Sequence, residues 1–160
     1  MCSAALKARI RRTQAADLAA VQQLLAAAGL PTEDLTSAPG LHFWSVEADS
    51  RVVAAIGLER FGMGGLLRSL AVDPAHQRRG LGFDLVAHLE SDARTVGVDQ
   101  LVLLTQTAEP FFRRLGYSVI DRLFVPDELK HSEEFRSLCP ASAVCMTKSL
   151  VSRRSGVSHG

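Results

Sequence analysis

The sequence carries almost no net charge. Eighteen Lys and Arg residues oppose 17 Asp and Glu residues, which gives a formal charge of +1 at pH 7. The basic doublets are spread along the chain, at Arg11-Arg12, Arg78-Arg79, Arg113-Arg114 and Arg153-Arg154. Binding a long polyanion normally requires a concentrated basic face with several phosphate contacts. The charge balance therefore argues against a nucleic-acid partner, although a local anion site stays compatible with it.

Cysteines and long apolar runs are also scarce. The cysteines are Cys2, Cys139 and Cys145, an odd number without the CxxC spacing of zinc sites, and the histidines show no ligand spacing either. We assign no metal, and we interpret Cys139 and Cys145 as core residues, with a site for a thiophilic ligand as the alternative. No apolar run approaches the roughly 20 residues that span a bilayer, and residues 1–10 lack the apolar centre of a signal peptide. We expect a cytoplasmic protein with no membrane partner.

The composition is that of an ordinary globular domain. The 160 residues are 47% hydrophobic and 22% charged. A domain of this size buries roughly 70% of its unfolded surface, so it needs neither a disulfide nor a metal to be stable. We expect one domain over residues 1–150 and a disordered tail over residues 151–160, where apolar periodicity is missing.

The order of the expected elements is mixed α/β. Apolar residues at helical spacing predict a helix between Thr13 and Gly29 and a longer one from Gly80 to Gly97. Shorter helices are expected over residues 108–115 and within residues 126–138. Strands are expected over residues 8–12, 41–48, 51–60, 66–72, 101–105, 117–123 and 143–150. The continuous apolar run of residues 101–105 is typical of a strand in the centre of a sheet.

The segment Gln77-Arg-Arg-Gly80-Leu-Gly82 stands between an expected strand and an expected helix. The first turn of a helix has unpaired N–H groups and a partial positive charge, so it stabilises an anion. Gly80 and Gly82 have no side chains that would block a pyrophosphate, and the three preceding side chains add hydrogen-bond donors. The alternative is that the glycines only shape the turn and the arginines are solvated. The strand end Val72-Asp-Pro directly before the segment favours a pyrophosphate site.

This segment resembles the most diagnostic motif of the GCN5-related N-acetyltransferase (GNAT) superfamily, Q/R-x-x-G-x-G/A after a strand ending in V-D-P. A second family signature has its counterpart in Phe112-Arg-Arg-Leu-Gly116-Tyr117. The resemblance extends from about Ile10 to Met146. Residues 64–71, 103–108 and 134–146 are more closely similar to N-acetyltransferases of arsenic-resistance operons and to the acetyltransferase domain of N-acetylglutamate synthases.

The resemblance implies a fold and a cosubstrate. The fold is a mixed, mostly antiparallel central sheet of six to seven strands, splayed between strands 4 and 5 and flanked by about four helices. The cosubstrate is acetyl-CoA, whose pantetheine lies in the slot between the splayed strands. The resemblance assigns the binding of this cosubstrate to Leu70, Ala71, Val72, Gln77, Arg78, Arg79, Gly80, Leu81, Gly82, Thr105 and Phe112.

The resemblance also implies catalytic roles and exposes departures from the family pattern. A backbone N–H of Leu70 or Ala71 would stabilise the oxyanion. Many members carry a catalytic Glu in the region that is Gly64-Gly65 here, so Glu59 is our candidate base, with an exposed strand-end carboxylate as the alternative. Phe112 stands where many members have a proton-donating Tyr, and phenylalanine has no proton to donate. The remaining sources of that proton are a water molecule, Thr105, Thr107 and Ser142, unless the thiolate leaves unassisted.

The expected function is transfer of an acetyl group from acetyl-CoA to the amine of a small, amino-acid-like substrate. Arg68 is a candidate partner for a substrate carboxylate, with a structural arginine as the alternative, and Ser142 is a candidate substrate contact. The alternatives to this function are a catalytically weak acyl-CoA-binding regulatory module and a protein or peptide N-acetyltransferase. A homodimer is compatible with the sequence.

Overall fold

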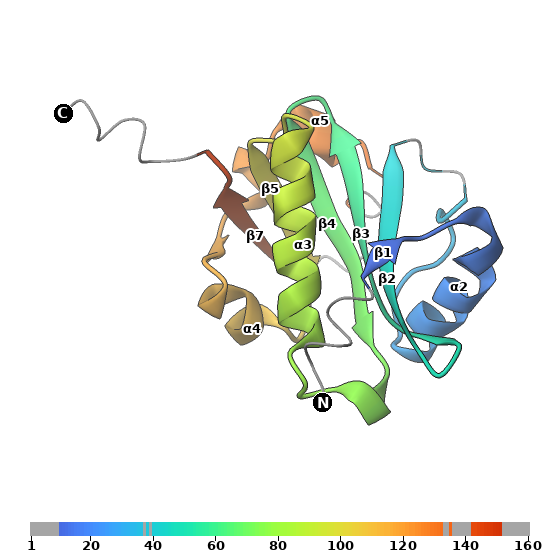
Figure 1. The fold of residues 1–160 in the computed structure, drawn as a ribbon. Helices are drawn as coiled ribbons and strands as arrows, with labels where there is room; N and C mark the ends of the chain where they lie inside the picture. The colour runs from blue at the N-terminus through green and yellow to red at the C-terminus, as the bar shows by residue number, and fades with distance from the viewer. Residues whose placement is uncertain (1–9, 37, 39, 133–134, 136–141, 152–160) are drawn as a thin grey trace.

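The computed structural model describes residues 10–36, 38, 40–132, 135 and 142–151. Within them, seven strands form one sheet that carries helices on both faces (Figure 1). The strands are β1 (Arg11–Arg12), β2 (Leu41–Ala48), β3 (Arg51–Phe61), β4 (Gly64–Val72), β5 (Gln100–Thr105), β6 (Ser118–Val119) and β7 (Val144–Ser149). The α-helices are α2 (Leu18–Ala27), α3 (Leu81–Thr95), α4 (Glu109–Arg114) and α5 (Asp127–Lys130). Three short 3-10 helices, Ala15–Asp17, Pro74–His76 and Arg122–Phe124, complete the described part.

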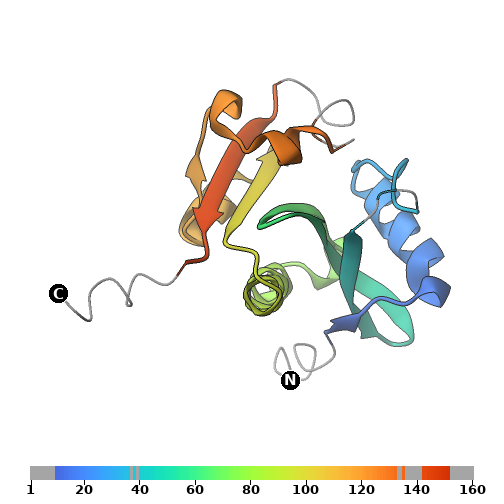
Figure 2. The ribbon, with the colours of Figure 1, turned by 90° about the horizontal axis from the view of Figure 1, so that it is seen from above.

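The strand order is β1-β2-β3-β4-β5-β7-β6, and the β4–β5 pair is parallel among otherwise antiparallel neighbours. Strands β4 and β5 are paired only where Gly64–Leu66 face Gln100–Val102. Beyond these positions the two strands part, although β4 continues to Val72 and β5 to Thr105. Seen from above, the sheet opens between the green β4 and the yellow β5 (Figure 2). The expected splay between the fourth and fifth strands is confirmed.

The connection between β2 and β3 shows how local sequence sets the register. Its two central residues, Asp49 and Ser50, have φ values of 54° and 63°. Two residues in the left-handed region form the tight turn whose twist matches that of paired strands. Short polar side chains tolerate this conformation better than branched apolar ones. The hairpin therefore forms over the residues expected from the sequence.

Helix α3 covers one face of the sheet. Its apolar residues Leu81, Leu85 and Leu89 belong to the same buried cluster as Ile56 and Leu67 of the sheet. The alternate residues of the strands face the opposite side, because side chains alternate along a strand. There α2 packs through Val21 and Leu25, and α5 packs through Leu129. Helices α2 and α5 thus cover separate parts of one face.

Two boundaries differ from the sequence predictions. The strand expected over residues 117–123 is wrong for most of its length, since β6 contains only Ser118 and Val119. The carboxylate of Asp121 accepts a hydrogen bond from the N–H of Leu123 at 2.9 Å and caps a 3-10 helix there. Strand β4 begins at Gly64, two residues before the expected start.

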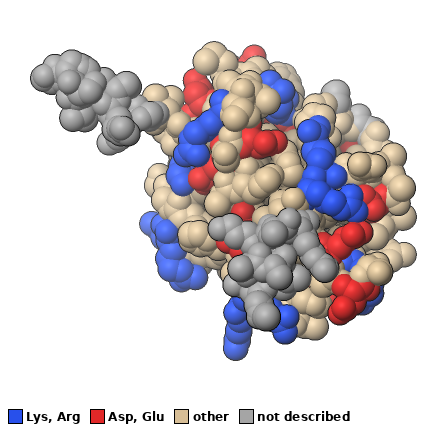
Figure 3. Space-filling view, viewed as in Figure 1, with Lys and Arg blue, Asp and Glu red and all other residues tan. Residues whose placement is uncertain are grey.

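Some predictions fall on residues that the structure does not describe. These are the disordered tail from residue 152, the positions of Cys2 and Cys139, and most of residues 133–141. Cys145 is buried on β7, as expected. Among the described helices, none has the length and apolar character required to cross a membrane. On the face seen in Figure 3, basic and acidic side chains are interspersed.

Candidate active site

A cavity of about 440 Å³ lies in the slot where β4 and β5 part. One wall is formed by residues 67–70 of β4 and another by residues 103–108 of β5 and the turn that follows. The end of α2 and the next residues, Ala28–Pro31, form a third wall. Phe112 and Ala143 complete the lining. Segments far apart in the sequence therefore enclose one site at the splay.

The backbone of β4 presents polar groups to this slot. The N–H of Asp73 donates to the carbonyl of Val53 on β3 at 2.7 Å, so residue 73 faces β3. In an antiparallel pair, successive residues direct their N–H and C=O groups alternately toward the partner strand and away from it. Val72 and Leu70 therefore face away from β3 and into the slot, and Ala71 faces β3. Two of the backbone positions expected to hold pantetheine lie as that role requires.

A β-bulge interrupts β4 beside Leu70. The register changes from Ala55↔Ala71 to Gly57↔Arg68, so Ser69 and Leu70 share one position opposite β3. Ser69 adopts a φ of 60°, which is uncommon for a residue with a side chain. A bulge disrupts the ladder locally and increases the twist of its strand. The bulge therefore contributes to the separation of β4 from β5 at the cavity.

The loop after β4 leads into α3 through two residues in the left-handed region, Arg78 with φ of 68° and Gly80 with φ of 82°. Gly80 is the N-cap of α3, and no side chain caps this end of the helix. The first N–H groups of an α-helix have no partner within the helix. The N–H groups of Leu81, Gly82 and Phe83 therefore have no partner within the helix or from a capping side chain.

The three side chains of the loop, at residues 77–79, differ in their contacts. Gln77 donates from Nε2 to the carbonyl of Val72 at 3.0 Å and fastens the loop to the end of β4. Arg78 and Arg79 are exposed, and they make no hydrogen bond or ion pair with any residue the structure describes. Neither guanidinium group is therefore engaged by another described residue.

Thr105 and Phe112 line the cavity at the β5 side. The Thr105 hydroxyl accepts a hydrogen bond from the N–H of Ala108 at 2.9 Å, just before α4. Phe112 is buried and packs edge-on against Phe111 and Tyr117, with ring centroids 5.0 Å and 5.5 Å away. Tyr117 is the one tyrosine of the chain, and its hydroxyl donates to Glu90 at 2.9 Å, away from the cavity lining. A tyrosine therefore cannot supply the proton at this site.

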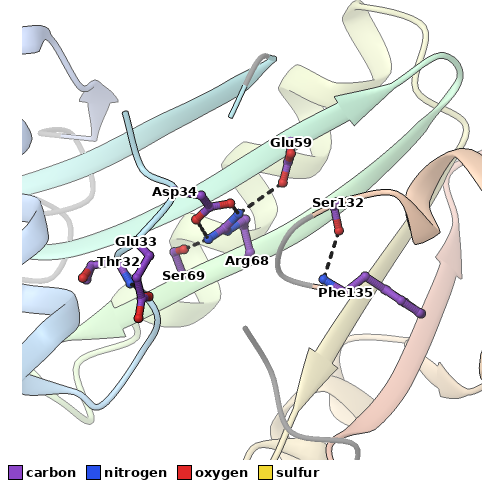
Figure 4. A network of polar contacts seen from close by, with 8 residues as sticks. All are labelled: Thr32, Glu33, Asp34, Glu59, Arg68, Ser69, Ser132 and Phe135. Carbon is purple, nitrogen blue, oxygen red and sulfur yellow. Dashed lines mark hydrogen bonds and ion pairs between the residues drawn. The ribbon is translucent and has the colours of Figure 1, made fainter. Parts of the chain in front are cut away.

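A buried ion-pair network centred on Arg68, a residue of the lining, borders the cavity (Figure 4). The Arg68 guanidinium is fully buried and donates two hydrogen bonds of 2.7 Å to the two carboxylate oxygens of Asp34. It also donates to Glu59 at 3.1 Å. A buried charge is costly unless it is paired, and the network provides partners of opposite charge. Sequence analysis missed Asp34, because it lies 34 positions from Arg68 in a loop without a motif.

Glu59 is 3% exposed, which rules out an exposed strand-end carboxylate. Burial raises the pKa of this carboxyl above its ordinary value, and the charge of Arg68 opposes the shift. Glu59 does not itself line the cavity. Arg68 lines it and donates a hydrogen bond to Glu59, so the guanidinium connects this carboxylate to the cavity wall. Ser142 is exposed and directly precedes Ala143, a residue of the lining.

The geometry agrees with a comparison against protein families. Residues 39–119, just over half of the chain, match the model of the acetyltransferase (GNAT) domain. The chain belongs to the GNAT acetyltransferase family. This membership confirms the enzyme class expected for the domain, an acetyl-CoA-dependent N-acetyltransferase. Within the described residues, no group of three or more potential metal ligands occurs.

Similar proteins support the same family. An amino-acid acetyltransferase of Pseudomonas syringae pv. syringae is 33% identical over 85 residues, which are 51% of this chain and 20% of that protein. The chain thus spans about a fifth of that relative's length.

Solved GNAT structures share the fold. Rv2747 of Mycobacterium tuberculosis, solved with CoA, has a TM-score of 0.75 at 27% identity over 89% of this chain and 99% of its own. N-acetylglutamate synthase of Neisseria gonorrhoeae, complexed with CoA and N-acetyl-glutamate, has a TM-score of 0.75 at 20% identity over 89% of this chain and 35% of its own.

Proposed function

We propose that this GNAT protein transfers the acetyl group of acetyl-CoA to the amine of a small, amino-acid-like acceptor. The observation that carries the proposal is the cavity at the splay, which Leu70 lines on the same strand that leads through Val72 to the uncapped start of α3. Its volume of about 440 Å³ is within the range of small-molecule sites. The names of the Pseudomonas and Neisseria relatives add support for an amino-acid acceptor.

Acetyl-CoA would bind along β4. Its pyrophosphate would accept hydrogen bonds from the N–H groups at the start of α3, near Arg78 and Arg79. Its pantetheine would follow the edge of β4 past Val72 to Leu70. The carbonyl of Val72 is already occupied by Gln77, so the Val72 N–H is the group left for the cosubstrate.

The Leu70 N–H would stabilise the oxyanion that forms when the amine attacks the thioester. Such a donor contributes about 3 kcal/mol to the transition state in other enzymes. Because the donor belongs to the backbone, replacing the Leu70 side chain would not remove it. The bulge at Ser69 supports this role, since it changes the direction of the strand at this point.

Glu59 would act as the base. An amine with a pKa of about 8 to 10 is mostly protonated at neutral pH and must lose a proton before it attacks. Glu59 lies behind the lining, so the proton would pass to it through water. The raised pKa of Glu59 favours this role, because a carboxylate with a higher pKa accepts a proton more readily.

Phe112 cannot protonate the departing thiolate, which therefore either leaves unassisted or takes a proton from another group. Thr105 and Thr107 both line the cavity and carry hydroxyl groups. Ser142 and a water molecule are the other candidates.

Arg68 would reach a substrate carboxylate only by sharing the guanidinium with Asp34 and Glu59. A homodimer stays a prediction.

The test is a CoA-release assay with acetyl-CoA and a panel of amino acids, amino-acid analogues and simple amines. Turnover with at least one member is expected. Glu59→Gln should lower kcat about 100-fold without changing the affinity for CoA. Glu109→Gln is the matched control and should behave as wild type, because Glu109 is a half-buried carboxylate on α4 that pairs with Arg113 and does not line the cavity. Absence of turnover across the panel, in protein that binds CoA, would refute the proposal.

A second candidate is a catalytically weak acyl-CoA-binding module, which the buried Phe112 favours. Acetyl-CoA would raise the melting temperature of such a module, but no acceptor would cause its consumption. A third candidate is acetylation of a protein or peptide. It requires an open groove beside the slot, so residues 40–44 and 125–139 would have to leave that entrance uncovered. Part of that second segment lies outside the described residues, so turnover of N-terminal peptides in the same assay is the test.

A further inference from the structure

Asp34 is a buried carboxylate for which the acetyl-transfer steps above have no use. It lies in the loop after α2 and is 4% exposed. Its Oδ1 and Oδ2 each accept a hydrogen bond of 2.7 Å from the Arg68 guanidinium. A bidentate pair of this kind is short and restricts both partners to one relative orientation. The position of Asp34 is therefore coupled tightly to that of Arg68.

This pair joins two walls of the same cavity. Arg68 lines the cavity from β4, and Ala28–Pro31 line it from the chain segment that continues to Asp34. Leu35, next to Asp34, is buried against the cluster that holds α2 on the sheet. Figure 4 shows the Asp34 loop beside β4, with the two side chains bridging the space between them. The Asp34–Arg68 pair therefore links these two walls directly.

The direction of β4 tells which end of the cavity this is. Val72 is tied to the anion-binding loop by Gln77, and the chain then runs back through Leu70 and the bulge at Ser69 to Arg68. Arg68 lies opposite Gly57 and Val72 opposite Ala54, so at about 3.3 Å per position Arg68 lies roughly 10 Å along the strand from Val72. If the pyrophosphate binds at the loop and the thioester at Leu70, then Arg68 lies beyond the thioester, at the end where the acceptor enters.

We infer that Asp34 is a positioning residue for the acceptor: by holding Arg68 in a bidentate pair, it sets the width of the acceptor end of the cavity. It acts through Arg68 and contacts no reacting atom. The inference rests on the proposed function, since it assigns an acceptor to this end of the slot. It predicts a change in acceptor binding with little change in CoA binding or in the chemical step.

The experiment compares Asp34→Asn with the wild type in steady-state kinetics and in calorimetric titration with CoA. The amide keeps the shape of the side chain but loses one of the two acceptor oxygens. The acceptor KM should rise about tenfold, kcat at saturating acceptor should change less than about threefold, and the Kd for CoA should stay within about twofold. Glu33→Gln is the matched control, because Glu33 is exposed in the same loop, and it should leave all three unchanged.

The possible failures are distinguishable. An unchanged acceptor KM in Asp34→Asn would refute the inference while leaving the proposed function intact. A parallel loss of CoA affinity and acceptor affinity would show a structural role alone and would also refute it. A wild type that uses no acceptor would refute the proposed function and the role of Asp34 with it. Asp34→Glu, which keeps the charge but displaces the carboxylate by one methylene, serves as the second variant if Asp34→Asn does not fold, and the same rise in KM is expected because the bidentate geometry is lost.

Discussion

At the residue scale, the pyrophosphate site proposed at the start of α3 depends on the absence of a side chain at Gly82. Gly82 lies in the first turn of this helix, where a Cβ atom would stand 3.4 Å from the ring of Phe111. That distance is ordinary contact, so a small side chain fits in the protein itself. The reason for glycine here must therefore be sought in the ligand, because a side chain would project beside the unpaired N–H groups.

Gly82→Asp should weaken CoA binding about 100-fold, since it places a carboxylate against the pyrophosphate. Gly82→Asn, of the same size but without the charge, should lose much less. Calorimetric titration with CoA at two salt concentrations measures the difference, which should shrink as salt increases. Equal affinities of the Asp and Asn variants would contradict the assignment of this loop to the pyrophosphate.

Glu59 should give the reaction its acidic pH limb. Burial raises the pKa of this carboxyl above the ordinary value of 4.5, and only the ionised form accepts a proton. As pH falls through the raised pKa, Glu59 becomes protonated and kcat/KM should decline, with a midpoint above 4.5. Rate profiles of wild type and Glu59→Gln test this, because the variant should lack the limb. A midpoint at or below 4.5 would show that another group titrates.

At the scale of elements, polar contacts hold β7, which lies on the far side of the splay from β4, against α3 and the end of α4. Strand β7 pairs with β5 beyond the splay, and its Lys148 reaches across to Glu90 on α3 at 3.0 Å. The same amine donates to the carbonyl of Leu115 at 2.8 Å, and Tyr117 also donates to Glu90. The largest cause of the raised pKa of Tyr117 is burial. These contacts tie α3, α4 and β7 together behind the cavity.

Lys148→Met should lower the free energy of unfolding by about 2 kcal/mol, because it leaves the buried Glu90 without its cation. Lys130→Met is the control, since Lys130 makes a longer, surface pair of 3.6 Å with Asp127, and it should cost less than about 0.5 kcal/mol. Urea unfolding followed by circular dichroism measures both. Similar values for the two variants would show that the Glu90 contacts add no stability.

At the scale of the whole molecule, CoA should stabilise the fold. The proposed site takes groups from β4, β5, α3 and α4, which come together only in the native state. A ligand at 100 times its Kd adds about 2.7 kcal/mol, which raises the melting temperature by several degrees for a domain of this size. Thermal unfolding with increasing CoA tests this, and adenosine should give a smaller shift. No shift at millimolar CoA, in folded protein, would contradict the site.

The sequence by itself determined the structural features that depend on residues close together in the chain. The hairpin over β2 and β3, the turn at Gly80 that begins α3 and the apolar face of α3 all follow from residues a few positions apart, because their backbone preferences and periodicity can be read directly from the sequence. The family followed from the same local motifs. Several boundaries differ by one residue, and those of β6 and β4 differ by more, because capping by Asp121 and pairing at Gly64 depend on the surrounding structure.

The tertiary structure alone decided which side chains share the interior beside the cavity. Asp34, Glu59 and Arg68 carry no signal in their spacing, and a strand-end glutamate looks the same in sequence whether it is solvated or buried. Their pairing arises because the α2 loop is folded over β4, between the apolar clusters of α2 and α5. Charge burial depends on packing in three dimensions, so the environment of Glu59 and the role inferred for Asp34 could be reached only from the folded chain.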